Sequence, residues 1–325
     1  MRKLFVLALI TMGFLVSCEI AETDTNTDVE DAIMRAIAAD DSTYGLDGLG
    51  DIDEEYYSLG KAVSEAQLSL EAIELTSLDS NYVWSFGRRG MEVEREVIVE
   101  VENDSAAQAL ISHHMTGTFI VRQFDRVWTG ERTWDRGDSV RFSEKPIDMT
   151  THRRVAFRKR VNDAGEEQWI PTAMTLLSGR AGSTLDIEAL EWIAEDSTMV
   201  LSDFDTEYYS RRQPLVLSRS GVNQVNIIVS NDVEGEAEQV IGRLGYNPRM
   251  SRPDARSRFH SYYTETLENG DKVYVQRVAP IRQHHRHFKG FVEAIDYRTL
   301  FDHDYIEYAS ATLGFIYTTQ ERVRP

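Results

Sequence analysis

The spacing of hydrophobic and polar residues along this chain changes near residue 80. Before that point, Thr27–Glu30 has the pattern of a capping box, and Val29, Ile33 and Ile37 then recur at helical spacing. A helix is therefore predicted to begin there and to end near residues 40–44. After that point the period becomes two: valines alternate with glutamates, which predicts a strand with one buried face (Val93, Val97, Val99 and Val101 against Glu94, Glu96, Glu100 and Glu102).

The strand pattern continues to about residue 177. Runs at 106–115, 118–122, 154–161 and 169–177 are predicted as strands, with turn residues at 102–105 and 162–165. Helices followed by an antiparallel meander predict an α+β domain over residues 28–180. This order of elements resembles the cone-shaped nuclear transport factor 2-like fold, which implies an interior pocket.

The second half of the chain shows short strand patterns only. After a predicted linker at Ser178–Gly182, residues 184–320 alternate between short β runs and turns, and Asn269-Gly270 is the clearest hairpin turn. This spacing predicts an all-β sandwich. Residues 290–296 resemble the penultimate strand of immunoglobulin-like modules, although the cysteine–tryptophan–cysteine core of antibody domains is absent.

Two charge stripes suggest how strands pair. Arg154, Arg158 and Arg160 share one face of their predicted strand, as the glutamates of residues 94–102 share one face of theirs. If these two strands are neighbours, the stripes form cross-strand ion pairs such as Glu96 with Arg158.

The N-terminus has the layout of a secretory signal. Arg2 and Lys3 precede an uncharged, mostly apolar run at 4–16, which is too short to cross a membrane as a helix. Leu15-Val16-Ser17-Cys18 then resembles the lipobox of bacterial lipoproteins, and Cys18 is the only cysteine. The resemblance implies a signal peptide at 1–17, a lipid on Cys18, a tether at 18–27 and an envelope location. In the enterobacterial members of this family an aspartate after the cysteine favours retention in the inner membrane, so its replacement by Glu19 here implies the outer membrane.

The charge of the chain excludes two classes of partner. The formal net charge is −19, so the surface repels nucleic acid and anionic lipid head groups. The expected partners are the membrane, through the lipid anchor, and either another envelope protein or a small ligand. No cofactor is expected apart from the covalent lipid and a divalent metal at a cluster of histidines.

Two candidate sites follow from residue types. His285 and His287 would project from one face of an extended segment, and with His303 and Asp302 they form a candidate metal site. A second candidate is the pocket implied by the cone-like fold, with Tyr82, Trp84, His113 and His114 as lining residues. Core packing and solvated strand edges are the alternatives for these residues.

The sequence contains no nucleophile elbow, zinc-protease motif, phosphate loop or dinucleotide fingerprint. This favours a non-enzymatic binding or scaffold role for an envelope lipoprotein over catalysis. A small-molecule or catalytic pocket in the N-terminal domain and metal binding by the histidines at 284–303 remain as alternatives.

Overall fold

The structure of the protein is a computed structural model. In the part of the chain that it describes, nearly all of the regular secondary structure is strand. These are residues 25–39, 57–58, 82–128, 134–182, 184–194, 197–210, 215–218, 223–233, 238–246, 257–278 and 288–320. Within them the only helices are α1 (Thr25–Ala39) and α4 (Tyr297–Phe301). The expected α+β domain followed by an immunoglobulin-like sandwich is therefore wrong. The strands from residue 82 to 161 are 22 to 28 residues long, because the alternating pattern after residue 80 continues with few breaks.

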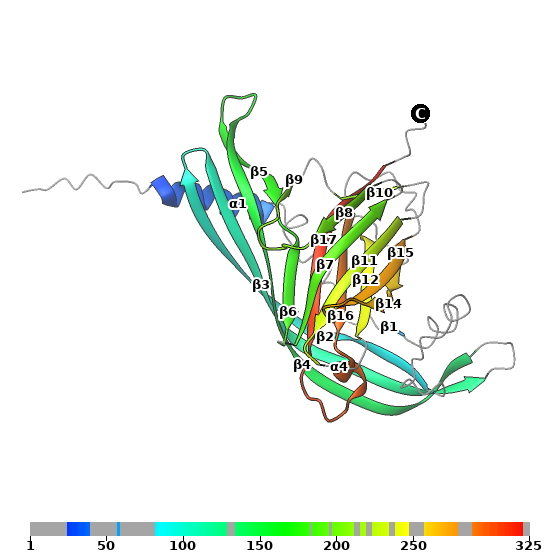
Figure 1. The fold of residues 1–325 in the computed structure, drawn as a ribbon. Coiled ribbons are helices and arrows are strands. Elements are labelled where there is room, and N and C mark those ends of the chain that lie inside the picture. The colour runs from blue at the N-terminus through cyan, green and yellow to red at the C-terminus, as the bar shows by residue number, and fades with distance from the viewer. Residues whose placement is uncertain are drawn as a thin grey trace, which may run out of the picture.

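Strands from both halves of the chain pair into one twelve-stranded sheet (Figure 1). Its main path runs β1-β2-β3-β4-β6-β17-β16-β12-β13, and β5, β9 and β10 branch from it. The members are β1 (Tyr57–Ser58), β2 (Tyr82–Asn103), β3 (Ala106–Trp128), β4 (Trp134–Val161), β5 (Glu167–Met174), β6 (Leu177–Ala181), β9 (Tyr209–Ser210), β10 (Leu215–Ser218), β12 (Gln239–Tyr246), β13 (Ser257–His260), β16 (Phe288–Ile295) and β17 (Ser310–Gln320).

The strand β6 occupies the place of the predicted linker. It pairs with β4 on one side and with β17 on the other, so it joins the N-terminal and C-terminal strands within the sheet. Gly179 sits in this strand where an added Cβ would lie 2.5 Å from the Thr150 carbonyl oxygen. The close approach of β4 to β6 therefore requires a glycine there.

A second, five-stranded sheet packs on part of the first. Its order is β14-β15-β11-β7-β8, and all its pairs are antiparallel. The members are β7 (Leu185–Ala194), β8 (Ser197–Leu201), β11 (Asn223–Asn231), β14 (Tyr262–Thr266) and β15 (Lys272–Val278). The hairpin turn predicted at Asn269-Gly270 is confirmed between β14 and β15, where Gly270 has a φ of +96°.

The space between the two sheets is filled by apolar side chains. Leu190 and Ile227 from the five-stranded sheet meet Val292 and Phe315 from the large sheet, and all four are fully buried. Trp192 packs edge-on against Phe315 with ring centroids 5.3 Å apart, and its Nε1 donates to the Val216 carbonyl at 2.8 Å. We call the side of the large sheet that meets this core, through Val292, Ala294, Leu313 and Phe315, the sandwich face.

The opposite side of the large sheet, which we call the helix face, is covered by α1 and α4. Ile33 and Ile37 of α1 are fully buried against β3 and β4, as their helical spacing predicted. Ala107 and Ala109 of β3 lie beneath them, and such short side chains let the helix approach the sheet closely. The long strands curve away from the five-stranded sheet where α1 covers them (Figure 1).

The helix α4 covers the other end of the helix face. Leu300 and Tyr308 are buried there, and Trp84 of β2 packs edge-on against Phe301 with ring centroids 5.0 Å apart. Asp296 caps the first turn of α4 by accepting from the Arg298 N–H at 2.8 Å.

The two charge stripes are not on neighbouring strands. Glu96 of β2 lies opposite Ser112 of β3, and Arg158 of β4 lies opposite Ala106 of β3, so β3 separates the stripes. Two strand spacings amount to about 10 Å, which exceeds the reach of a direct ion pair. The predicted pairing of Glu96 with Arg158 is therefore wrong.

Candidate functional site

A cleft of about 780 Å³ lies beside the sandwich. It lies on the sandwich face, where β4 and β6 extend past β7 of the five-stranded sheet. The segment 202–205, which follows β8, forms a further wall. Side chains on β4 alternate in direction, so Asp148, Thr150 and His152 all point into this space.

Carboxylates dominate the lining of this cleft. They come from three separate walls: one from β4, two from β7 and two from the segment after β8 (Asp148; Asp186 and Glu188; Asp203 and Asp205). Among the described residues of the lining, only Arg180 and His152 are basic. A concave surface with this charge attracts cations and repels anions.

Burial already perturbs one of these carboxylates. Partial burial raises the pKa of Asp186, while the backbone N–H of Ile187, 2.9 Å away, opposes the shift. Nearby Glu188 raises this pKa further, and Arg180 lies at a long 3.5 Å from Asp186 Oδ2. A cation that entered the cleft would favour the charged form of this carboxylate.

A serine, a histidine and an aspartate meet in the cleft without forming a catalytic triad. Asp205 Oδ1 lies 2.7 Å from His152 Nε2, and Ser178 Oγ lies 3.3 Å from the same nitrogen. A triad needs the acid on one ring nitrogen and the nucleophile on the other. Both partners share Nε2 here, so the arrangement supports polar binding and not activation of Ser178.

A second, smaller cavity of about 280 Å³ lies further along β4. Its floor is mostly alanine, from β3, β4 and β5 (Ala106, Ala107, Ala156 and Ala173), and Phe157 and Arg158 also line it. Tyr208 closes one side and donates from its hydroxyl to Gln108 Oε1 at 2.8 Å. Partial burial raises the pKa of the Tyr208 hydroxyl.

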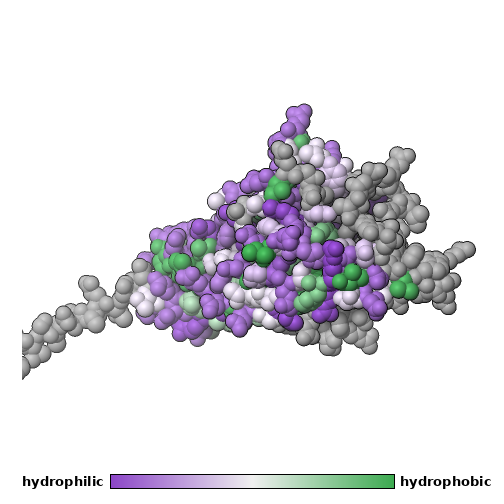
Figure 2. Space-filling model, turned by 90° about the horizontal axis from the view of Figure 1, so that it is seen from below, coloured by the Kyte–Doolittle hydropathy of each residue, from purple (hydrophilic) through white to green (hydrophobic). Residues whose placement is uncertain are grey.

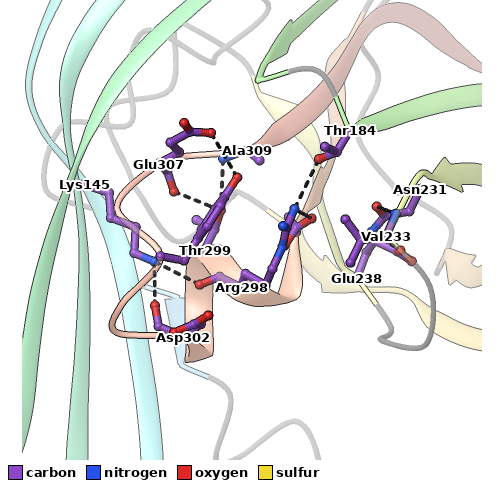
Figure 3. A network of polar contacts seen from close by, with 12 residues as sticks. Lys145, Thr184, Asn231, Val233, Glu238, Arg298, Thr299, Asp302, Glu307 and Ala309 are labelled. Atoms are coloured by element: carbon purple, nitrogen blue, oxygen red, sulfur yellow. Dashed lines mark hydrogen bonds and ion pairs between the residues drawn. The ribbon is translucent and has the colours of Figure 1, made fainter.

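A polar network fixes the position of α4 (Figure 3). Lys145 of β4 is buried and donates from Nζ to the carbonyls of Arg298 and Asp302, both at 2.9 Å. These are carbonyls at the C-terminal end of the helix, where a cation is favoured. Burial lowers the pKa of Lys145 to about 8, although Asp302 and Asp296 oppose the shift. These residues line neither of the two cavities, and we assign the network to stability.

The helix face also holds a buried ion pair. Arg88 of β2 donates to Glu293 of β16, and both side chains are about 3% exposed or less. The Tyr308 hydroxyl donates to the same Glu293 oxygen and accepts from Arg88 Nη2 at 2.8 Å. Burial raises the pKa of Tyr308, so the hydroxyl keeps its proton. These three residues tie β2, β16 and the segment after α4 together.

The four residues predicted to line a pocket are not brought together. Trp84 of β2 is opposite Gln123 of β3, and His113 of β3 is opposite Arg95 of β2. Gln123 and His113 are ten residues apart along β3, so about 33 Å of strand separates Trp84 from His113. Trp84 and His113 are buried on the helix face and Tyr82 is half-buried. His114 is exposed and bonds Asp148 at 2.9 Å, which places it beside the cleft. None of the four lines either cavity.

The predicted metal site lies partly outside the described residues. His285 and His287 are among those outside, whereas Asp302 and His303 are exposed on the segment after α4. Among the residues that the structure describes, no group of three or more His, Cys, Asp or Glu side chains is arranged to hold a metal ion. Cys18 and its lipobox also lie outside the described residues.

Sequence reasoning missed the cleft. Asp148, Thr150 and His152 alternate on β4, and Asp186 and Glu188 alternate on β7, so polar residues at period two gave a signal. The same alternation of polar residues is found on any strand face that is exposed to solvent, so it does not by itself indicate a cleft. Only the packing of the two sheets shows that these faces approach each other.

The comparisons with protein families, curated proteins and solved structures find no match to this chain. No helix among the described residues is long and apolar enough to cross a membrane. The surface seen in Figure 2 is mostly hydrophilic, with apolar residues in small separate patches.

Proposed function

We propose that this protein is a lipid-anchored binding protein of the cell envelope whose cleft binds an organic cation. The observation that carries the proposal is the cleft of about 780 Å³ with five carboxylates on three walls. Its volume falls within the usual range for small-molecule sites, about 300–1,000 Å³. An enzymatic role has less support, because Ser178 lacks the triad geometry that would activate it.

The distribution of charge favours an amine with more than one positive centre. Asp148 on β4 and Glu188 on β7 stand on different walls, and Asp205 stands on a third. A polyamine carries separated ammonium groups, so one molecule offers a positive centre to each of several walls. Each ammonium group donates up to three hydrogen bonds to carboxylate oxygens.

The lipid anchor is supported by the sequence around Cys18. Six residues lie between this cysteine and Thr25, the first residue of α1, so an extended chain of seven residue steps from Cys18 spans about 24 Å. An anchor on Cys18 would thus keep the helix α1 close to the membrane surface. Two acyl chains make such an anchoring stable.

The anchor is tested by growing cells with labelled palmitate. The wild-type protein should carry the label and fractionate with the outer membrane, and the Cys18→Ser variant should lose both properties. Equal labelling of the two proteins would contradict lipidation at Cys18.

The ligand class is tested by thermal unfolding with a panel of small molecules of different charge. Spermidine should raise the Tm by several degrees, since a ligand at one hundred times its Kd stabilises the folded state by about 2.7 kcal/mol. Citrate and glucose, matched in concentration, should leave the Tm unchanged. The spermidine shift should shrink at high NaCl concentration, because salt screens exposed charges. A larger shift with citrate than with spermidine would overturn the proposal.

A further inference from the structure

The segment between β8 and β9 crosses the open side of the large sheet. Residues 202–208, which we call the strap, leave the edge of the five-stranded sheet and reach β9, which pairs with β5 of the large sheet. Phe204 packs against the sandwich core near one end, and Tyr209 packs just after the other. The strap therefore has two fixed ends and spans both sheets.

Apart from the packing of Phe204, the strap touches the large sheet through a few polar side chains. Asp205 contacts His152 at 2.7 Å and Ser178 at 3.3 Å, and Tyr208 donates to Gln108 at 2.8 Å. Asp203, Asp205, Thr206 and Glu207 are all exposed. The bonds of Asp205 are exposed and that of Tyr208 is partly buried. Single hydrogen bonds of this kind contribute little net stability, so a small change in free energy breaks them.

The middle of the strap is a compact turn. The Asp203 carboxylate accepts from the Thr206 N–H at 3.0 Å and from the Thr206 hydroxyl, and the Glu207 N–H donates to the Asp203 carbonyl at 2.9 Å. These bonds to Thr206 lower the pKa of Asp203, so the turn is intact at neutral pH. Residues 203–207 therefore keep their shape when their contacts with the sheet are broken.

The strap separates two cavities that share one strand face. Asp148, Thr150 and His152 of β4 line the large cleft, and Ala156 and Arg158 of the same face line the small pocket. The strap crosses between them, with Asp205 over His152 and Tyr208 over Gln108, the residue opposite Ala156. From His152 to Ala156 the strand advances about 13 Å.

We propose that the strap is a gate, which Asp205 closes by binding His152 and Ser178, and that its opening joins the cleft and the small pocket into one groove along β4. The turn at 203–207 pivots as a block about Phe204, which stays packed on the sandwich core, so release of Asp205 also withdraws Tyr208 from Gln108. The open groove admits a ligand longer than the cleft. The role of the gate in ligand entry rests on the proposed cation site. The motion of the gate is independent of that site.

The gate is tested in the full-length protein by the reactivity of a cysteine placed in the small pocket. Ala156→Cys puts a thiol beside Tyr208 and away from Asp205, and the rate of its modification by a maleimide reports opening. The protein that keeps Ala156 gives the background rate of maleimide modification at Cys18. No ligand is present, so failure of spermidine binding does not affect the result.

In the Ala156→Cys background, Asp205→Ala should raise the rate of modification of the introduced thiol at least tenfold, and His152→Ala should do the same. Glu207→Ala is the matched control, since this exposed strap carboxylate makes no side-chain hydrogen bond or ion pair with any described residue. It should leave the rate within twofold of the background variant. No rise in the rate for Asp205→Ala would overturn the gate. An equal rise in Asp205→Ala and Glu207→Ala would also overturn it, because it would show a general loosening of the strap.

Discussion

The interior of the sandwich and the interior under α4 belong to the same large sheet, yet they are built differently. Val292 and Ala294 of β16 enter the sandwich, whose buried cluster is almost wholly apolar. The residue between them, Glu293, points to the other face and is buried with Arg88 and Tyr308. The sandwich is held mainly by apolar packing and has one buried carboxylate, Glu238, which is bonded to Tyr274 and Lys272. The interior under α4 adds a buried ion pair that joins β2 to β16.

The difference between these interiors predicts different responses to mutation. Removing an apolar side chain from the sandwich leaves a cavity. Removing a charge under α4 leaves its partner buried in an environment built for a pair. The expected losses of stability therefore rank from the buried charges, through the apolar core, to the exposed ion pairs.

The largest effect is expected for Glu293→Ala. It removes the carboxylate that accepts from both Arg88 and Tyr308, and loss of one member of a buried pair costs about 3–5 kcal/mol. The free energy of unfolding, measured by urea denaturation, should fall by that amount. The apolar double variant Arg88→Met/Glu293→Leu should recover most of the loss. A double variant less stable than Glu293→Ala would contradict this account.

Leu190→Ala makes the matching change in the sandwich. Leu190 is fully buried on β7, and large-to-small substitutions of this kind cost about 2–5 kcal/mol. Urea denaturation again gives the value. Met199→Ala on the adjacent strand β8 is the control, because Met199 is 45% exposed and its loss should cost far less. Similar losses in the two variants would show that the sandwich core is not packed as described.

Lys145 under α4 should make stability depend on pH in the alkaline range. Its pKa is about 8 in the folded protein and 10.5 as a free side chain, so between these values the unfolded chain binds more protons. Stability from this residue therefore rises with pH, by about 1 kcal/mol for the first pH unit above the folded-state pKa. The difference in unfolding free energy between the wild type and Lys145→Met should change by this amount. A difference that falls as pH rises would contradict the assigned shift.

The smallest effect concerns the charge stripes. Because β3 separates Glu96 from Arg158, a double-mutant cycle on this pair should give no coupling, below about 0.2 kcal/mol. The exposed pair His114–Asp148, 2.9 Å apart on adjacent strands, should give about 0.2–1 kcal/mol. Coupling in the first pair and none in the second would require a different strand order.

Local patterns predicted local elements well. The helical spacing of Val29, Ile33 and Ile37 predicted α1, and alternation predicted most strands of residues 184–320, such as β11 and β15. The same rules failed for the length of β4, whose residues 134–150 mix exposed charges with Lys145, Ile147 and Met149. A strand of this kind is recognised only once its neighbours are known.

The sheet order and the cleft lay beyond such rules. Residues 178–182 look like a linker because most of them are small, but Gly179 among them lets β6 fit between β4 and β17. The lining of the cleft comes from positions between 148 and 313, and its walls meet through contacts far apart in the sequence. Neither the period of a strand nor a local motif contains that information.

The most direct test of the cation site is a calorimetric titration of spermidine into two variants with the same change in net charge. Asp186→Asn/Glu188→Gln neutralises one wall of the cleft, and Asp163→Asn/Glu268→Gln neutralises two exposed carboxylates in turns outside it. The first variant should raise the Kd at least tenfold, and the second should leave it within twofold of the wild-type value. Equal affinities in the two variants would contradict binding in the cleft.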